Sequence, residues 1–305
     1  MDSGENQRER GLELKPGIYT DGHPLDEVHY LECKLILRAD HFSSAASFHE
    51  YAKLVRQAAE DHGIDFTAEH LKAAKPRIRE VVFLDTKDFS LYNNAFILRR
   101  RVTFEDGFPA GEPEVVFKFR HPNMQRAAEL DVRPSIPGEY RIKFKAEALP
   151  LKDKIGGYRM LFSHNVEFFL SEEHGLNRLS LSALAQVFPA LATLKASGTK
   201  QIVLVNQTIV EEVLQDLGML DFGKGVTAKS NVALWRQRGD HKQLIGEFSF
   251  ECKFKRHEEL HNKAMDRCKQ FFVALQELSR DWISLGTTKT GIVYRLKGNP
   301  PQAHE

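Results

Sequence analysis

The stretch FILRRRVTF, residues 96–104, alternates between apolar and polar side chains in the manner of a β-strand. One face carries phenylalanine, leucine and valine, and the other carries Arg99 and Arg101. The stretch EVVFKFR, at 114–120, repeats this pattern with a lysine and an arginine on its polar face. These two strands predict a sheet that has one apolar face and one face of fixed charges.

Further strands are expected on both sides of this pair. They lie at 28–38, 80–86, 128–134, 139–147, 201–207, 231–238 and 245–255. Helices are predicted over 43–62, 178–194 and 257–284, where apolar residues recur at helical spacing. The mixture of strands and helices predicts an α+β protein.

The domain organisation is expected to be simple. A single domain over 25–297 carries the strands, with a helical insertion near 148–200. The segments 1–24 and 298–305 are polar and contain glycine and proline, which is typical of flexible tails.

Two of the expected strands share a short sequence. Residues 31–35 read LECKL, and residues 250–254 read FECKF. If this echo reflects structure, the first and last long strands play equivalent parts on two sides of one sheet or barrel.

The composition is that of an ordinary folded protein, with 42% hydrophobic and 28% charged residues among 305. Lysine and arginine total 43 and aspartate and glutamate 42, so the net charge favours neither nucleic acid nor an anionic membrane as partner. No apolar run approaches the roughly 20 residues of a membrane span, and the first twenty residues lack the apolar core of a secretory signal. Three scattered cysteines favour a reducing compartment, so we expect a cytoplasmic protein without a membrane or nucleic-acid partner. The oligomeric state is left open.

The charged faces of the strands allow two interpretations. In the first, they meet water, as in many antiparallel sheets. In the second, the sheet closes into a barrel and the charges line its interior, which about eight strands can enclose. Such an interior would repel itself unless it held a polyanion and a metal, because arginine and lysine bind phosphate oxygens and carboxylates bind Mg²⁺ or Mn²⁺. The second interpretation therefore predicts a triphosphate or polyphosphate ligand.

The order of motifs resembles that of the CYTH, or triphosphate tunnel metalloenzyme, superfamily. The motifs are an acidic strand that ends in lysine (YLECK, 30–34), the segment FLDTKDFSLYNNAFILRRR (83–101), the basic VFKFR (116–120), the acidic AELDVRP (128–134), GEFSFECK (246–253) and TKTGIVYRL (288–296). The resemblance implies an antiparallel eight-stranded tunnel-like β-barrel with flanking helices. It also implies binding of a triphosphate with a divalent metal, followed by hydrolysis or, in class IV adenylate cyclases, cyclisation of ATP.

The resemblance and the charged faces together select the candidate site residues. Glu32 and Lys34 are the catalytic candidates. The phosphate-binding candidates are Lys34, Arg99, Arg101, Lys118, Arg120, Lys143, Lys145, Arg236, Lys253 and Lys289. The metal-ligand candidates, for Mg²⁺ or Mn²⁺, are Glu32, Glu129, Asp131, Glu247 and Glu251.

Two departures from the family pattern bear on the activity. The family's opening motif has a second glutamate where this chain has Tyr30, and Phe250 or Cys252 stands where the closing acidic pair would be completed. The leading hypothesis is metal-dependent hydrolysis of inorganic tripolyphosphate or an organic triphosphate, with cyclase activity disfavoured. The alternative is a non-catalytic module that binds a phosphate ligand and has a degraded metal site.

Other chemistries have weaker signals. His257 and His261 have the spacing of a helical metal pair, and HEELH (257–261) matches the H-E-x-x-H pattern, but this spacing also arises by chance on solvated helices. Neither a nucleophile elbow nor a Walker-type phosphate loop is present in the sequence.

Overall fold

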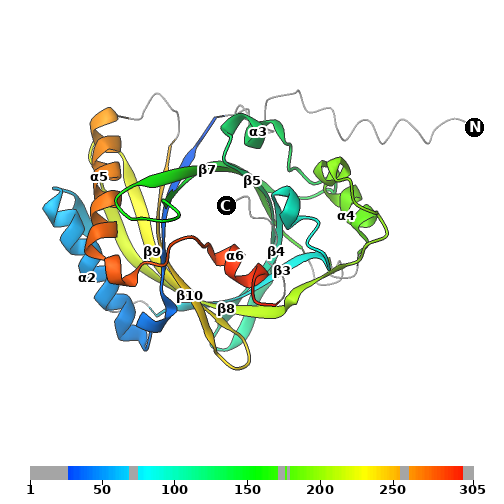
Figure 1. Cartoon of the computed structure of the whole chain (residues 1–305), viewed down its shortest axis with the longest axis horizontal. Coiled ribbons are helices and arrows are strands. Elements are labelled where there is room, and N and C mark those ends of the chain that lie inside the picture. The colour runs from blue at the N-terminus through cyan, green and yellow to red at the C-terminus, as the bar shows by residue number, and fades with distance from the viewer. Residues whose placement is uncertain (1–26, 69–74, 171–175, 177–178, 255–260, 298–305) are drawn as a thin grey trace, which may run out of the picture.

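The computed structural model describes residues 27–68, 75–170, 176, 179–254 and 261–297. Nine of the described strands close into a β-barrel, with helices packed outside the ring and one short helix inside it (Figure 1). The expected tails, 1–24 and 298–305, lie outside the described residues. No helix in the described part of the chain is long and apolar enough to cross a membrane.

The strands have the following bounds: β1 (Tyr30–Leu37), β2 (Asp65–Thr67), β3 (Arg77–Thr86), β4 (Phe96–Glu105), β5 (Phe108–His121), β6 (Arg141–Pro150), β7 (Tyr158–Phe169), β8 (Ile202–Asp221), β9 (Thr227–Gln237) and β10 (Gln243–Lys253). The order around the barrel is β8-β3-β4-β5-β7-β6-β1-β10-β9, and pairing of β9 with β8 closes the ring. The short β2 pairs with β8 beside the ring. Neighbouring strands are antiparallel except for β1 and β6, which are parallel.

The expected α+β tunnel-like barrel is confirmed. Its ring contains nine strands where eight antiparallel strands were expected, and one pair of neighbours is parallel. The additional strand is β7, which lies within the segment 148–200 that was expected to be a helical insertion. Its run of Ser163, His164 and Asn165 conceals the apolar alternation of a strand. The described helices of this segment include α4 (Leu181–Val187) and η5 (Pro189–Thr193).

A second correction concerns 128–134, where a strand was expected. The short helix α3 (Met124–Glu129) ends there, and a loop follows it. The side chain of Asn123 accepts a hydrogen bond from the backbone N–H of Arg126, which caps the start of this helix.

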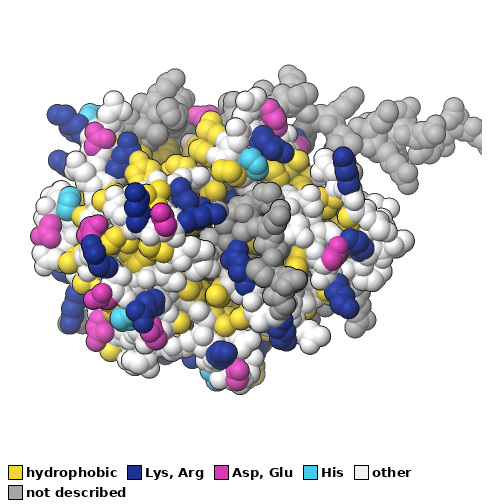
Figure 2. Space-filling model, viewed as in Figure 1, with side chains coloured by type: hydrophobic (Ala, Val, Ile, Leu, Met, Phe, Trp, Pro, Cys, Tyr) yellow, Lys and Arg dark blue, Asp and Glu magenta, His cyan; other side chains and the backbone are white. Residues whose placement is uncertain are grey.

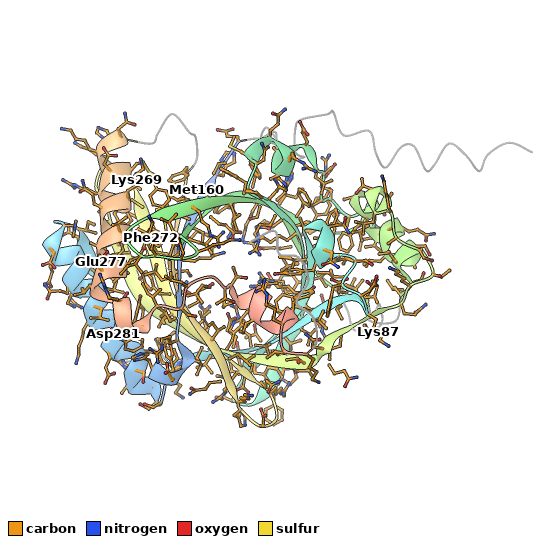
Figure 3. All side chains as sticks on the ribbon, viewed as in Figure 1. Lys87, Met160, Lys269, Phe272, Glu277 and Asp281 are labelled. Atoms are coloured by element: carbon orange, nitrogen blue, oxygen red, sulfur yellow. The ribbon has the colours of Figure 1, made fainter. Side chains whose placement is uncertain are left out.

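The outer helices cover one side of the barrel. They are α2 (Ala45–Asp61) and α5 (Asn262–Leu278), with the 3-10 turn η1 (Ala39–His41) before α2 and η7 (Arg280–Trp282) after α5. The 3-10 turn η2 (Tyr92–Asn94) lies between β3 and β4. The apolar stripe expected along 43–62 is buried in α2, from Phe48 to Ala59. On α5, Phe272 is buried against Phe250 of β10, whereas Lys269 is exposed (Figure 3). Burial of these stripes fixes the outer face of the sheet and leaves its charged face to the interior.

The helix α6 (Lys289–Tyr294) lies inside the ring of strands (Figure 1). Its last residue, Tyr294, is fully buried, stacks on Tyr92 with 4.0 Å between ring centroids, and donates a hydrogen bond to Asp85. Asp85 also accepts hydrogen bonds from the backbone N–H groups of Thr86 and Leu91 at 2.7 and 2.8 Å. The carboxylate therefore joins the turn after β3 to the helix that occupies the barrel.

This buried carboxylate predicts a pH dependence of stability. Burial raises the pKa of Asp85 from 3.8 to about 6 against the opposing effect of its hydrogen bonds. A raised pKa in the folded state means that the stabilisation is complete below about pH 4 and is lost as the pH rises through about 6. Relative to Asp85→Asn, the free energy of unfolding of the parent should be about 2 kcal/mol larger at pH 4.5 than at pH 7.5. Urea unfolding at both pH values measures this, and a difference that does not change with pH would contradict it.

Candidate functional site

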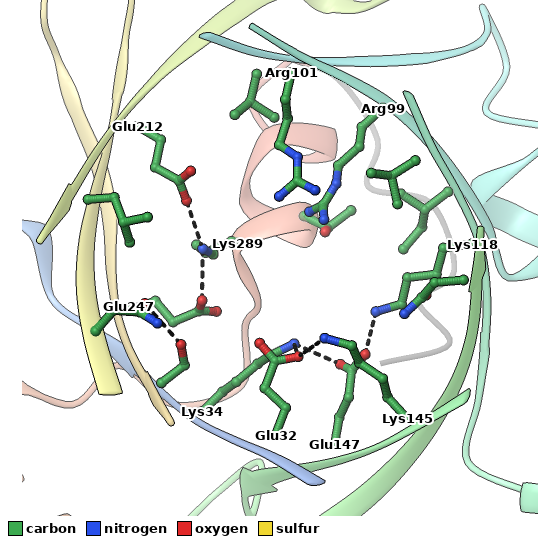
Figure 4. A pocket seen from close by; sticks show the side chains of 18 of the residues that line it. Glu32, Lys34, Arg99, Arg101, Lys118, Lys145, Glu147, Glu212, Glu247 and Lys289 are labelled. Carbon is green, nitrogen blue, oxygen red and sulfur yellow. Dashed lines mark hydrogen bonds and ion pairs between the residues drawn. The ribbon is translucent and has the colours of Figure 1, made fainter. Parts of the chain in front are cut away.

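A cavity of about 400 Å³ occupies the interior of the barrel. Side chains from the nine ring strands and from residues 288–290 line it (Figure 4). Twelve of these residues are lysine or arginine, and seven are aspartate or glutamate. On the face shown in Figure 2, Lys and Arg side chains also gather around the end of the barrel. An excess of cations in an enclosed space attracts an anionic ligand more strongly than the same charges would in water.

Three glutamates form a row across neighbouring strands. Glu147 of β6 lies opposite Glu32 of β1, and Glu32 lies opposite Glu251 of β10. We call these three residues the glutamate row. Like charges that face one another across strands destabilise a sheet unless cations lie between them. The row therefore needs positive partners.

Lysines supply those partners. Lys34 Nζ lies 3.0 Å from Glu147 Oε2 and 3.1 Å from Glu32 Oε2 (Figure 4). Lys145 Nζ lies 3.4 Å from Glu32 Oε2 and forms an ion pair with Glu251. Burial alone would raise the pKa of Glu32, but Lys145 and Lys34 outweigh it and hold that pKa well below its usual value. The glutamate row is thus ionised and is neutralised from within the barrel.

Glu147 is the most enclosed member of the row. Its side chain has no solvent exposure, forms an ion pair with Lys118, and accepts a 2.6 Å hydrogen bond from the Ser163 hydroxyl. Burial and the charges of Lys34 and Arg120 together lower the pKa of Lys118 to about 7, against the opposing effect of Glu147. Lys118 can therefore gain a proton near neutral pH when a further anion approaches.

A second cluster of charges joins α6 to the barrel wall. Lys289 Nζ lies 2.7 Å from Glu247 Oε1 and 3.2 Å from Glu212 Oε1 (Figure 4). Glu212 also accepts hydrogen bonds from Trp235 Nε1 and Arg79 Nε, each at 2.8 Å. Lys289 fixes the start of α6 against β8 and β10, so the helix contributes a cation to the cavity.

The arginines of β4 differ from the lysines because their charge is only partly balanced. Arg101 pairs with Glu114 at 2.6 Å. Among the described residues, Arg99 has no carboxylate within ion-pair distance, and the buried Nε atoms of both arginines lack a hydrogen-bond partner. Burial lowers the pKa of Arg101 to about 10, and the charge of Arg99 contributes to the fall. These two arginines, which we call the β4 wall, therefore present positive charge to the cavity that is only partly compensated.

Most of the residues selected from the sequence meet in this cavity. Those in its lining are Glu32, Lys34, Arg99, Arg101, Lys118, Arg120, Lys143, Lys145, Glu247 and Lys289. Glu251 joins them through its ion pair with Lys145.

The structure places four of the selected residues elsewhere. Glu129 is exposed on α3, because the chain is helical there and does not extend into the barrel. Asp131 follows in the loop and pairs with Arg133. Arg236 of β9 pairs with Glu211, and Lys253 is an exposed residue at the end of β10. None of the four lines the cavity.

Sequence reasoning did not select Glu147, Glu212 or Arg79. Glu147 shares its alternating face with Lys143 and Lys145, which is a signal that could have included it. Glu212 lies in the second half of β8, beyond the strand expected at 201–207. Arg79 lies just before the strand expected at 80–86.

The carboxylates do not fit a divalent metal as they are arranged. Three of the five metal-ligand candidates, Glu129, Asp131 and Glu251, lie outside the cavity lining. Glu251 and the two that line the cavity, Glu32 and Glu247, each form an ion pair with a lysine. In the described part of the chain, no group of three or more His, Cys, Asp or Glu side chains converges as a metal site requires. A resident Mg²⁺ or Mn²⁺ would have to displace an ammonium group from these oxygens.

No protein-family model and no curated protein matches the chain. Among solved structures, it is similar to HpAC1 from Hippeastrum, which is provisionally described as an adenylyl cyclase with a dominant triphosphatase activity. The two share 12% identity with a TM-score of 0.42, and the match covers 91% of this chain and 100% of that one. It is also similar to a protein from Bacillus halodurans provisionally described as an adenylate cyclase, at 13% identity and a TM-score of 0.39, covering 89% of this chain and 98% of that one.

At such identities and TM-scores the similarity is one of fold alone. The chemistry of this cavity has to be argued from its own residues.

Proposed function

We propose that the chain binds an inorganic or organic triphosphate, or a polyphosphate, inside the barrel. The observation that carries the proposal is the β4 wall, where Arg99 and Arg101 line a cavity rich in cations and no described carboxylate lies within ion-pair distance of Arg99. Guanidinium groups bind phosphate oxygens through paired, charge-assisted hydrogen bonds. A linear oligophosphate carries several such oxygens in a row, which suits a wall that extends from Arg101 through Arg99 to Lys118 on the adjacent strand.

Hydrolysis of the bound triphosphate with Mg²⁺ or Mn²⁺ is the second candidate function. The observation that favours it is the glutamate row, in which three carboxylates face the same interior across adjacent strands. The lysines between these carboxylates favour binding without turnover. The binding function therefore comes first.

We infer a reducing, cytoplasmic setting, in keeping with three buried free cysteines.

One pair of measurements separates the two functions. Phosphate release is followed from tripolyphosphate, ATP and thiamine triphosphate, with Mg²⁺, with Mn²⁺ and with a chelator, and the melting temperature is recorded in each case. If the chain binds a triphosphate without hydrolysing it, no phosphate is released and the melting temperature rises. A ligand at about 100 times its Kd stabilises a protein by about 2.7 kcal/mol.

Metal-dependent release that is lost in Glu32→Ala would establish hydrolysis instead. If tripolyphosphate neither raised the melting temperature nor released phosphate, the proposed binding site would be refuted.

A further inference from the structure

The glutamate row carries carboxylate oxygens of the kind that bind a metal, but lysine ammonium groups lie between its members. Its carboxylates are held in register by backbone pairing between β6, β1 and β10. Between Glu147 and Glu32 stands the ammonium of Lys34, and between Glu32 and Glu251 stands the ammonium of Lys145. Positive and negative groups therefore alternate along the row, and every gap between carboxylates already contains a charge.

Tyr30 strengthens this arrangement. It lies two residues before Glu32 on the same face of β1, at the position where the motif resemblance implies another glutamate. The ammonium groups of Lys145, Lys143 and Lys253 lie 5.5, 5.7 and 5.8 Å from the centroid of its ring. An aromatic ring attracts ammonium groups through its negative face, whereas it provides no oxygen ligand for Mg²⁺ through that face. Tyr30 thus favours lysines where a carboxylate would favour a metal.

We propose that the ammonium group of Lys145 takes the place of a divalent metal ion between Glu32 and Glu251, so that the cavity binds its oligophosphate without a metal. The part of this statement that concerns the ligand rests on the proposed function. The part that concerns the cation stands on the geometry of the row alone.

The charge of Lys145 is consistent with this role. Burial alone would lower its pKa, but Glu32 and Glu251 outweigh burial and raise it above its usual value. The lysine thus stays charged over the whole physiological range. Unlike a bound metal, this cation is covalently attached and cannot be removed by a chelator.

The first test is a titration of the full-length protein with Mn²⁺, followed by the loss of the electron paramagnetic resonance signal of free Mn²⁺. We expect the parent to bind Mn²⁺ only at millimolar concentrations or above. Lys145→Met removes the ammonium and leaves Glu32 and Glu251 facing each other, so it should bind Mn²⁺ about tenfold tighter or more. Lys200→Met is the control, because Lys200 also forms an ion pair with a carboxylate, that of Asp88, but lies outside the cavity lining. It should bind Mn²⁺ as the parent does.

Two results of this titration would overturn the inference. The first is stoichiometric, tight Mn²⁺ binding by the parent that disappears in Glu32→Gln. The second is a folded Lys145→Met variant with no gain in Mn²⁺ affinity. If Lys145→Met does not fold, the titration of the parent still decides.

Calorimetry of tripolyphosphate binding separates this inference from the proposed function. Equal affinity for tripolyphosphate in chelator and in Mg²⁺ supports both the metal-free site and the triphosphate function. Binding that requires Mg²⁺ overturns the metal-free site but leaves the triphosphate function intact. Absence of binding in either buffer overturns the triphosphate function, while the Mn²⁺ titration still decides the role of Lys145.

Discussion

Replacing Arg99 with glutamine is expected to weaken the binding of tripolyphosphate about a hundredfold, which corresponds to about 2.7 kcal/mol. Arg99 faces the cavity from the middle of β4, and among the described residues no carboxylate neutralises it. An anion therefore gains hydrogen bonds to a charged guanidinium group without having to break an existing ion pair. Titration calorimetry of the two proteins measures the loss directly.

Arg100 provides the matched control. It is the next residue on the same strand, lies outside the cavity lining, and pairs with Glu80 at 3.4 Å. Arg100→Gln removes the same charge from the other face of the sheet and should change the affinity by less than about threefold. Arg99→Gln should not lower the melting temperature, since it relieves repulsion with Arg101. If Arg99→Gln bound tripolyphosphate as tightly as the parent, the β4 wall would not be the binding surface.

Arg99 and Arg101 also illustrate what can be predicted from the sequence. Their spacing of two, opposite apolar residues, places both on one face of a strand, and the outer helices bury the other face. The same local rule accounts for Lys118 and Arg120 on β5. Where a site residue lies on a regular strand, its direction can be read from its neighbours in the chain.

The partners of these residues depend on pairings that no local pattern contains. Glu147 lies opposite Glu32 because β6 and β1 pair in parallel. This pairing also brings Lys34 into contact with Glu147, which is 113 residues away in the chain. The echo between 31–35 and 250–254 predicted strands on two sides of one sheet or barrel, whereas β1 and β10 are adjacent and antiparallel. The prediction that Glu129 lies on a strand is wrong for a different reason. The alternation of charges at 128–134 is outweighed by a helix that Asn123 caps at its start.

Replacing Glu147 with glutamine is expected to cause the largest loss of stability of any cavity substitution. Glu147 is fully buried and is the main counter-charge of Lys34 and Lys118, so the variant leaves both buried lysines beside Arg120 without it. Removing one partner of a buried ion pair costs about 3–5 kcal/mol. At the 2–4 °C per kcal/mol typical of chains of similar size, the melting temperature should fall by roughly 10 °C.

Thermal unfolding of Glu147→Gln and of a control, Glu277→Gln, tests this expectation. Glu277 is half exposed and pairs with Arg280 on the surface of the molecule, so its loss should shift the melting temperature by no more than about 2 °C. Tripolyphosphate should raise the melting temperature of Glu147→Gln more than that of the parent, because its phosphates supply the counter-charge that the variant lacks. Equal shifts in the two proteins would show that the anion does not reach Lys34 and Lys118. The phosphate chain would then have to bind along the β4 arginines alone.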